Sequence, residues 1–63
     1  MTTVTVYLPP DEAEALAQFT KRLGFDDCKR LSNRHDGGLE AEQMWSAVNK
    51  LRTALAEAGF APR

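Results

Sequence analysis

The chain has 63 residues, a formal net charge of −1 and one cysteine. So short a chain predicts one small domain over residues 1–63. It buries only ~60% of its unfolded surface, so an oligomer, a metal or disulfides often support such a core. The near-neutral charge disfavours nucleic acid as a partner, and a single cysteine excludes a disulfide within the chain.

Residues 2–8, Thr-Thr-Val-Thr-Val-Tyr-Leu, alternate polar and apolar side chains with a period of two. This alternation, and the preference of Thr, Val and Tyr for pleated surfaces, predict a half-buried strand. The two faces of the strand are Val4, Val6 and Leu8 on one side and Thr3, Thr5 and Tyr7 on the other.

The predicted strand has no partner in its own chain, because everything after Pro9 has the pattern of helix or loop. An unpaired strand leaves backbone donors and acceptors unsatisfied and offers an edge to other strands. We therefore predict pairing between chains, in a homodimer or with another protein. The predicted fold class is α+β, with one N-terminal strand, two main helices and the option of a short third helix between them.

A first helix is predicted from Pro10 to about Leu23. Pro10 suits the first turn, acidic residues follow it, and basic residues precede the end of the helix. Gly24 is expected in the left-handed conformation that ends a helix, with Phe25 as the apolar residue of a Schellman motif. The predicted buried face consists of Ala13, Leu16, Ala17, Thr20 and Leu23, with Phe19 at its flank.

Residues 26–38 separate the two main helices. Residues 26–32 favour a short helix with an Asp cap and with Leu31 pinned to the core. The rest has the composition of a loop, in which the paired glycines give a hinge or a tight turn. Together with the preceding Lys21 and Arg22, its basic residues Lys29, Arg30 and Arg34 give residues 21–34 a net charge of +3 against Asp26 and Asp27. The segment is either a solvated helix end or a surface that attracts phosphates or an acidic protein.

A second helix is predicted from about Leu39 to Ala58. Apolar side chains step by three and four along it, the narrow seam used when one helix packs along another. Gly59 and Phe60 repeat the Gly-Phe ending of the first helix. Trp45 lies beside the seam, so it is either a core residue or an interface anchor. The seam residues are Ala41, Met44, Val48, Leu51, Leu55 and Ala58.

The sequence carries no convincing catalytic signature. Cys28 and His35 are the only soft metal ligands, whereas a closed zinc site needs four. No apolar run approaches the ~20 residues of a membrane span, and no signal peptide is recognisable. We predict a protein that is not an enzyme, has no metal, cofactor or membrane contact, and works in a reducing cytoplasm. Its partner contacts are expected at Thr3, Thr5, Tyr7, Lys29, Arg30, Arg34 and Trp45.

Residues 2–25 resemble the start of a ribbon–helix–helix repressor, with Leu-Pro-Pro-Asp-Glu at residues 8–12 between a short strand and an amphipathic helix. In that family, the strands of two protomers pair and enter the major groove of DNA, where outward side chains read bases. The resemblance implies a dimer. The outward positions of this chain carry no basic or amide side chain with which to read bases. A DNA-binding transcriptional regulator or antitoxin is therefore the alternative function and not the first one.

A second resemblance covers nearly the whole chain. Residues 3–6, 15–25 and 50–63 are similar to a family of small uncharacterised proteins carried on proteobacterial phages, prophages and plasmids. The small size and the genomic setting of this family resemble those of anti-CRISPR proteins, which bind a bacterial defence complex and block it. The resemblance therefore implies a non-enzymatic inhibitor or modulator from a mobile element. Its expected partner is a CRISPR–Cas complex or another defence protein in the bacterial host cell.

Overall fold

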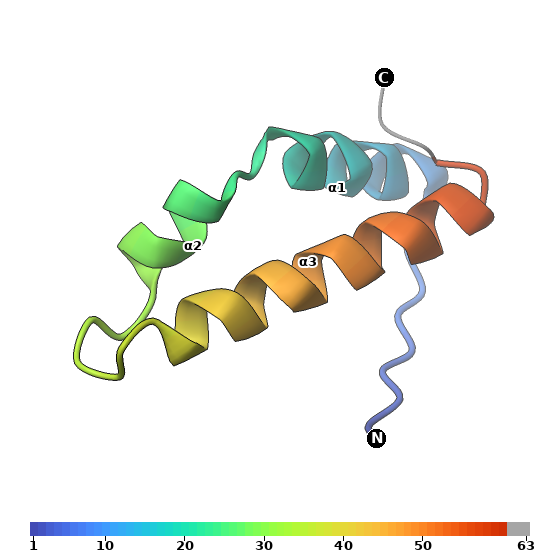
Figure 1. Ribbon diagram of the computed structural model, residues 1–63. Helices are drawn as coiled ribbons and strands as arrows, with labels where there is room; N and C mark the ends of the chain where they lie inside the picture. Colours follow the sequence, from blue (N-terminus) through green and yellow to red (C-terminus); the bar gives the residue numbers. More distant parts are fainter. Residues whose placement is uncertain (61–63) are drawn as a thin grey trace.

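The computed structural model describes residues 1–60, in which three helices follow an extended N-terminal segment (Figure 1). The helices are α1 (Pro10–Arg22), α2 (Phe25–Leu31) and α3 (Leu39–Glu57). Helices α1 and α2 follow one another along one side of α3, and both pack against it. The result is a flat helical hairpin with overall dimensions of 38 × 27 × 15 Å.

The predicted N-terminal strand is wrong, and with it the α+β class. Residues 1–9, here called the arm, are extended, but they form no strand within the described part of the chain. A strand needs hydrogen bonds from a neighbouring strand, and the later elements of residues 1–60 are helices that satisfy their backbones internally. Within residues 1–60 the period-two pattern therefore marks an extended segment with an apolar side and not a member of a sheet.

Helix α1 is confirmed to within one residue of its predicted end. Pro10 lies in the first turn, where its missing N–H costs nothing, and Asp11 and Glu12 stand at the positive end of the helix dipole. Lys21 and Arg22 occupy the last turn, at the negative end. Its buried residues belong to the predicted face and are all small, which allows a close approach to α3: Ala13, Ala17 and Thr20.

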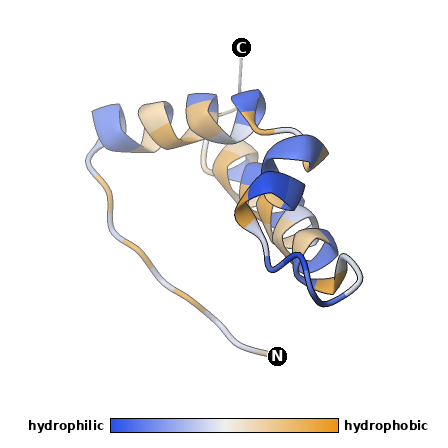
Figure 2. Cartoon of the chain, turned by 90° about the vertical axis from the view of Figure 1, so that its left-hand side faces the viewer, coloured by the Kyte–Doolittle hydropathy of each residue, from blue (hydrophilic) through white to orange (hydrophobic). Residues whose placement is uncertain are grey.

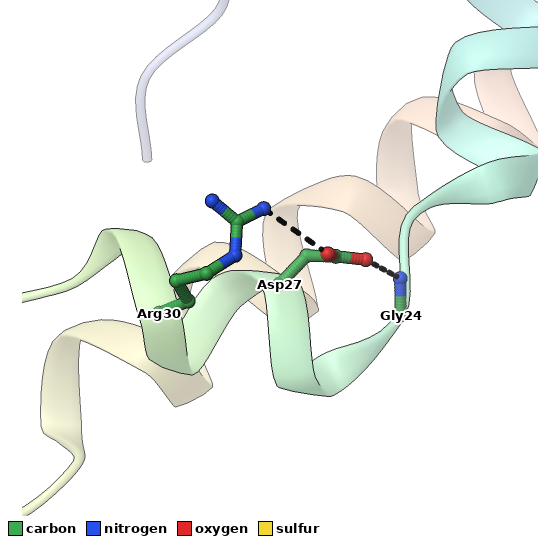
Figure 3. Close-up of polar contacts among 3 residues, drawn as sticks. All are labelled: Gly24, Asp27 and Arg30. Atoms are coloured by element: carbon green, nitrogen blue, oxygen red, sulfur yellow. Dashed lines mark hydrogen bonds and ion pairs between the residues drawn. The ribbon is translucent and has the colours of Figure 1, made fainter.

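The predicted left-handed helix end at Gly24 is also wrong. Gly24 is extended, with φ −114° and ψ 171°, and it is the N-cap of α2. Its backbone N–H donates to the Asp27 carboxylate at 2.8 Å (Figure 3). Its carbonyl accepts the N–H groups of Asp27 and Cys28. The short helix is therefore confirmed, but its cap is Gly24, with Asp27 as the reciprocal acceptor.

Helix α3 and its predicted ending are confirmed. Gly59 has φ +95°, a left-handed conformation that glycine adopts without strain. Its N–H donates to the carbonyl of Ala56 at 3.0 Å, and the N–H of Phe60 donates to the carbonyl of Leu55 at 2.8 Å. These are the two hydrogen bonds of a Schellman motif, so the backbone of α3 closes its own C-terminal end.

The core between the helices is small. Thr20 is fully enclosed there, and its hydroxyl donates to the carbonyl of Ala17 at 2.9 Å. The predicted anchor Leu31 is 62% exposed, because α2 buries Cys28 one turn earlier and ends at Leu31. A large apolar side chain contributes ~1.5–3 kcal/mol when fully buried. A core with one buried leucine therefore implies a small free energy of unfolding. The buried apolar residues among those described are Ala13, Ala17, Cys28, Ala41 and Leu55.

Candidate interaction surfaces

A pocket with basic side chains lies at the loop end of the hairpin. The end of α2, the loop after it and the start of α3 form it, and its volume is about 380 Å³. Lys29 and Arg30 come from α2 and Arg34 from the loop, so the structure brings these predicted contacts together. No carboxylate is among its described lining residues. We call it the basic pocket, and it is lined by Lys29, Arg30, Ser32, Asn33, Arg34, Gly38 and Ala41.

Side-chain hydrogen bonds hold the loop of the basic pocket in shape. The Asp36 carboxylate accepts the backbone N–H groups of Gly38 at 3.0 Å and Glu40 at 2.9 Å, at the start of α3. The Glu40 carboxylate accepts the N–H of Asn33 at 2.8 Å and so ties the loop to α3. Gly37 and Gly38 have φ of +71° and +90°, which confirms the paired-glycine turn. The loop is therefore ordered by its own contacts before any ligand binds.

The three basic side chains of the pocket are only weakly neutralised. Arg30 donates to Asp27 at 3.3 Å, and the Lys29 ammonium lies 3.9 Å from the Asp26 carboxylate, which is 98% exposed. Exposed pairs of this kind hold their charges loosely. Arg34 has no ion pair within the part of the chain that the structure describes. The basic pocket therefore keeps positive charge for an outside anion.

Asp27 connects the basic pocket to the start of α2 (Figure 3). One carboxylate oxygen accepts the Gly24 N–H and the other accepts the Arg30 guanidinium. The hydrogen bond from Gly24, followed by the contact with Arg30, lowers the pKa of the Asp27 carboxyl below its ordinary value. An ionised Asp27 thus orders the start of α2 and orients one of the pocket's cations.

Trp45, predicted to be either a core residue or an anchor, is half-buried between α2 and α3. Its ring meets the Phe25 ring edge to face, with centroids 6.2 Å apart and an interplanar angle of 65°. The Arg52 guanidinium carbon lies 5.1 Å from the centre of the Trp45 ring, and the Lys29 ammonium lies 5.8 Å from that of Phe25. Trp45 therefore helps to hold α2 on α3 beside the basic pocket.

Arg52 is a structurally central residue that no pattern in the sequence singles out. Its Nε donates to the carbonyl of Thr20 at 2.8 Å, and its Nη2 donates to the carbonyls of Thr20 and, at 2.7 Å, Leu23. Carbonyls at the end of a helix are short of intrahelical donors, and that of Thr20 shares Arg52 with a 3.3 Å bond from the Leu23 N–H, so Arg52 caps α1 from α3. The one available signal is a basic residue directly beside the seam position Leu51.

The other end of the hairpin carries an apolar groove of about 300 Å³ between the arm, α1 and the C-terminal half of α3. Val4 and Val6 are 79% and 65% exposed, so the arm does not fill it. Figure 2 shows the arm, with alternating apolar residues, running away from the start of α1. We call this the arm groove, and it is lined by Val4, Val6, Leu8, Leu16, Leu51, Ala54, Leu55 and Ala58.

The remaining predicted contacts, Thr3, Thr5 and Tyr7, are exposed on the arm and are absent from the described lining of the arm groove. Successive side chains of an extended chain point to opposite sides, so these three face away from Val4 and Val6. Tyr7 is 92% exposed. Because the arm leaves at the end of the hairpin opposite the α2–α3 loop (Figure 1), the predicted contacts do not form one site.

Residues 1–60 contain no group of three or more His, Cys, Asp or Glu side chains placed to share a metal ion. Cys28 is a buried free thiol, and His35 is exposed in the loop. None of the described helices combines the length and the apolar character needed to cross a bilayer. The two surfaces are thus defined by charge and by apolarity.

The fold and these surfaces define a small helical protein with a basic pocket at one end and an open apolar groove at the other. The chain belongs to a family of unknown function (DUF7706), whose family model matches residues 1–63. No curated protein and no solved structure matches the chain.

Proposed function

We propose that this protein is a non-enzymatic inhibitor or modulator that binds an acidic surface of a larger protein through its basic pocket. The observation that carries the proposal is the convergence of Lys29, Arg30 and Arg34, from α2 and the loop, on one pocket without a carboxylate in its described lining. A guanidinium group pairs with a carboxylate through two parallel hydrogen bonds, so acidic side chains fit this pocket.

A CRISPR–Cas complex or another bacterial defence protein is the partner to test first. The resemblance in size and genomic setting to anti-CRISPR proteins supports this choice. In this proposal a phage or another mobile element carries the protein, which acts in the cytoplasm of the bacterial host. Trp45 supports the surface by packing α2 on α3, and Tyr7 and the arm threonines are a second contact region.

The ribbon–helix–helix alternative has less support than the inhibitor. It required a strand at residues 2–8, and the described chain has an unpaired extended arm there. The net charge of −1 also gives no general attraction to the phosphate backbone. Duplex DNA is therefore one outcome of the experimental test and not a second proposal.

The test is a pull-down with the immobilised chain from a bacterial lysate that contains a CRISPR–Cas system, before and after nuclease treatment. Wild type is compared with Arg34→Glu and with the matched control Lys50→Glu. Neither side chain has an ion pair among the described residues, and Lys50 lies on α3 outside the basic pocket. We expect Arg34→Glu to weaken binding about tenfold and Lys50→Glu to leave it nearly unchanged.

Three results decide between the possibilities. A defence complex that is retained after nuclease treatment and lost only in Arg34→Glu supports the proposal. Equal losses in both variants would show that net charge governs binding, and the pocket would have no special role. Capture that disappears with nuclease would make nucleic acid the bridge and favour the regulator. Far-UV circular dichroism of each variant verifies that the helices are intact.

A further inference from the structure

The chain exposes far more surface than a folded protein of its size should. Its accessible surface is 5081 Å². A folded monomer of 7.0 kDa is expected to expose roughly 4,000 Å². The excess of about 1,000 Å² is close to the ~800 Å² that each partner buries in a standard protein interface. The molecule therefore has enough uncovered surface for one stable interface.

The arm and the arm groove account for the uncovered apolar surface at one end of the hairpin. Every residue of the arm is exposed, including Val4, Val6 and Tyr7. No charged side chain is among the described lining residues of the groove, and residues 1–9 contain none. An occupant of the groove should therefore be neutral and apolar.

The arm does not close over its own groove, because its exit from α1 is restrained. Pro9 has φ −57° and ψ 153°, and Pro10 occupies the first helical turn. A proline ring fixes φ, and the residue before a proline is held extended, so Leu8 and Pro9 keep the arm pointing away from α1. The prolines thus fix the direction in which the arm leaves α1, which reduces the conformational entropy that this part of the arm loses on binding.

We propose that the arm groove is a homodimer interface in which the arm of each copy enters the groove of the other. A second copy supplies an occupant of the required chemistry, an arm without charged side chains and with Val4 and Val6 on one side. In a two-fold symmetric dimer each chain gives an arm and receives one, so both grooves are filled at once. The proposal does not rest on the basic pocket, which lies at the opposite end of the hairpin.

The test is sedimentation velocity of the full chain over a wide range of concentrations. Wild type should have twice the mass of the 7.0 kDa chain. Val6→Asp and Val4→Asp should raise the dimer dissociation constant about a hundredfold, because an unpaired carboxylate would be buried in an apolar groove. Both positions are largely exposed in the single chain, so its helices should not depend on them.

Thr5→Asp is the matched control, since it adds the same charge to the same arm on the side away from the groove. It should stay dimeric. A wild-type chain that is monomeric at every concentration would overturn the proposal. This holds even if the arm binds a different protein. A dimer that survives both valine substitutions, or one that Thr5→Asp disrupts equally, would also overturn it. These results are independent of the pull-down, which tests the basic pocket.

Discussion

The same dipeptide, Gly-Phe, stands after Leu23 at the end of α1 and after Ala58 at the end of α3, and its two copies behave in opposite ways. Gly59 is left-handed and ends α3 with the two hydrogen bonds of a Schellman motif. Gly24 is extended and begins α2. The difference lies in the residues after the glycine, because Asp27 accepts the Gly24 N–H and so favours a new helix start.

The two helix ends are consequently closed by different means. The end of α3 is closed by its own backbone, through residues within one turn. The end of α1 lacks the Schellman bonds, and Arg52 of α3 instead donates to the carbonyl of Thr20, in the last turn, and to that of the C-cap residue Leu23. A local motif and a tertiary contact thus do the same physical task at two places in one small chain.

The largest effect is expected from removing the tertiary closure. Arg52→Ala should lower the free energy of unfolding by about 2–3 kcal/mol, because it leaves the carbonyls of Thr20 and Leu23 without their charged donor and removes the contact with Trp45. Urea denaturation measures the change. Arg22→Ala, at an exposed position at the end of α1, is the control and should cost about 0.5 kcal/mol or less. Similar losses in both variants would mean that α1 does not need Arg52.

The next effect compares the two glycines directly. Gly59→Ala should destabilise by about 1–2 kcal/mol, since φ +95° is unfavourable for any residue with a Cβ. Gly24→Ala should change stability by only about 0.5 kcal/mol, because its backbone is extended and an added Cβ would lie 3.8 Å from the Asp27 carboxylate, an ordinary contact. Thermal unfolding of the two alanine variants measures both changes in stability. Equal effects at the two positions would contradict the contrast.

A smaller gain is expected from improving the start of α2. Gly24→Ser should stabilise the protein by a few tenths to about 1 kcal/mol, because serine is a better N-cap than glycine and restricts the unfolded chain. Gly59→Ser should destabilise it, as alanine does. Chemical denaturation of the two serine variants gives the sign of each change in the free energy of unfolding. A loss of stability at both positions would show that Gly24 needs the conformational freedom of a glycine.

The smallest effect is a dependence of α2 on pH. The pKa of Asp27 is lowered in the folded protein, so its contribution is fully present above the unfolded pKa and is lost as pH falls through the folded value. We expect this part of the stability to fade below about pH 4. Asp27→Asn should remove that dependence, whereas Asp26→Asn, at an exposed position nearby, should keep it. Melting temperatures across the acidic range measure both.

Much of the helical framework follows from neighbouring residues alone. Pro10 with acidic residues behind it, the spacing of Ala13, Ala17 and Thr20, and the Schellman ending at Gly59 all act within one or two turns. The basic segment of the candidate site was recognisable in the same way. The pocket itself was not, because its shape depends on how Asp36 and Glu40 hold the loop against α3.

Contacts between distant residues decided the rest. The arm has the alternation of a strand, but a strand exists only where another edge supplies hydrogen bonds, and the described chain has none. Cys28 was buried by the docking of α2, and Arg52 reached across to α1. The N-cap at Gly24 is instead a local feature, set by Asp27 three residues later, and the Gly-Phe pattern concealed it. Local patterns determine which segments can be helical, whereas burial and the pairing of helix ends depend on which elements meet in space.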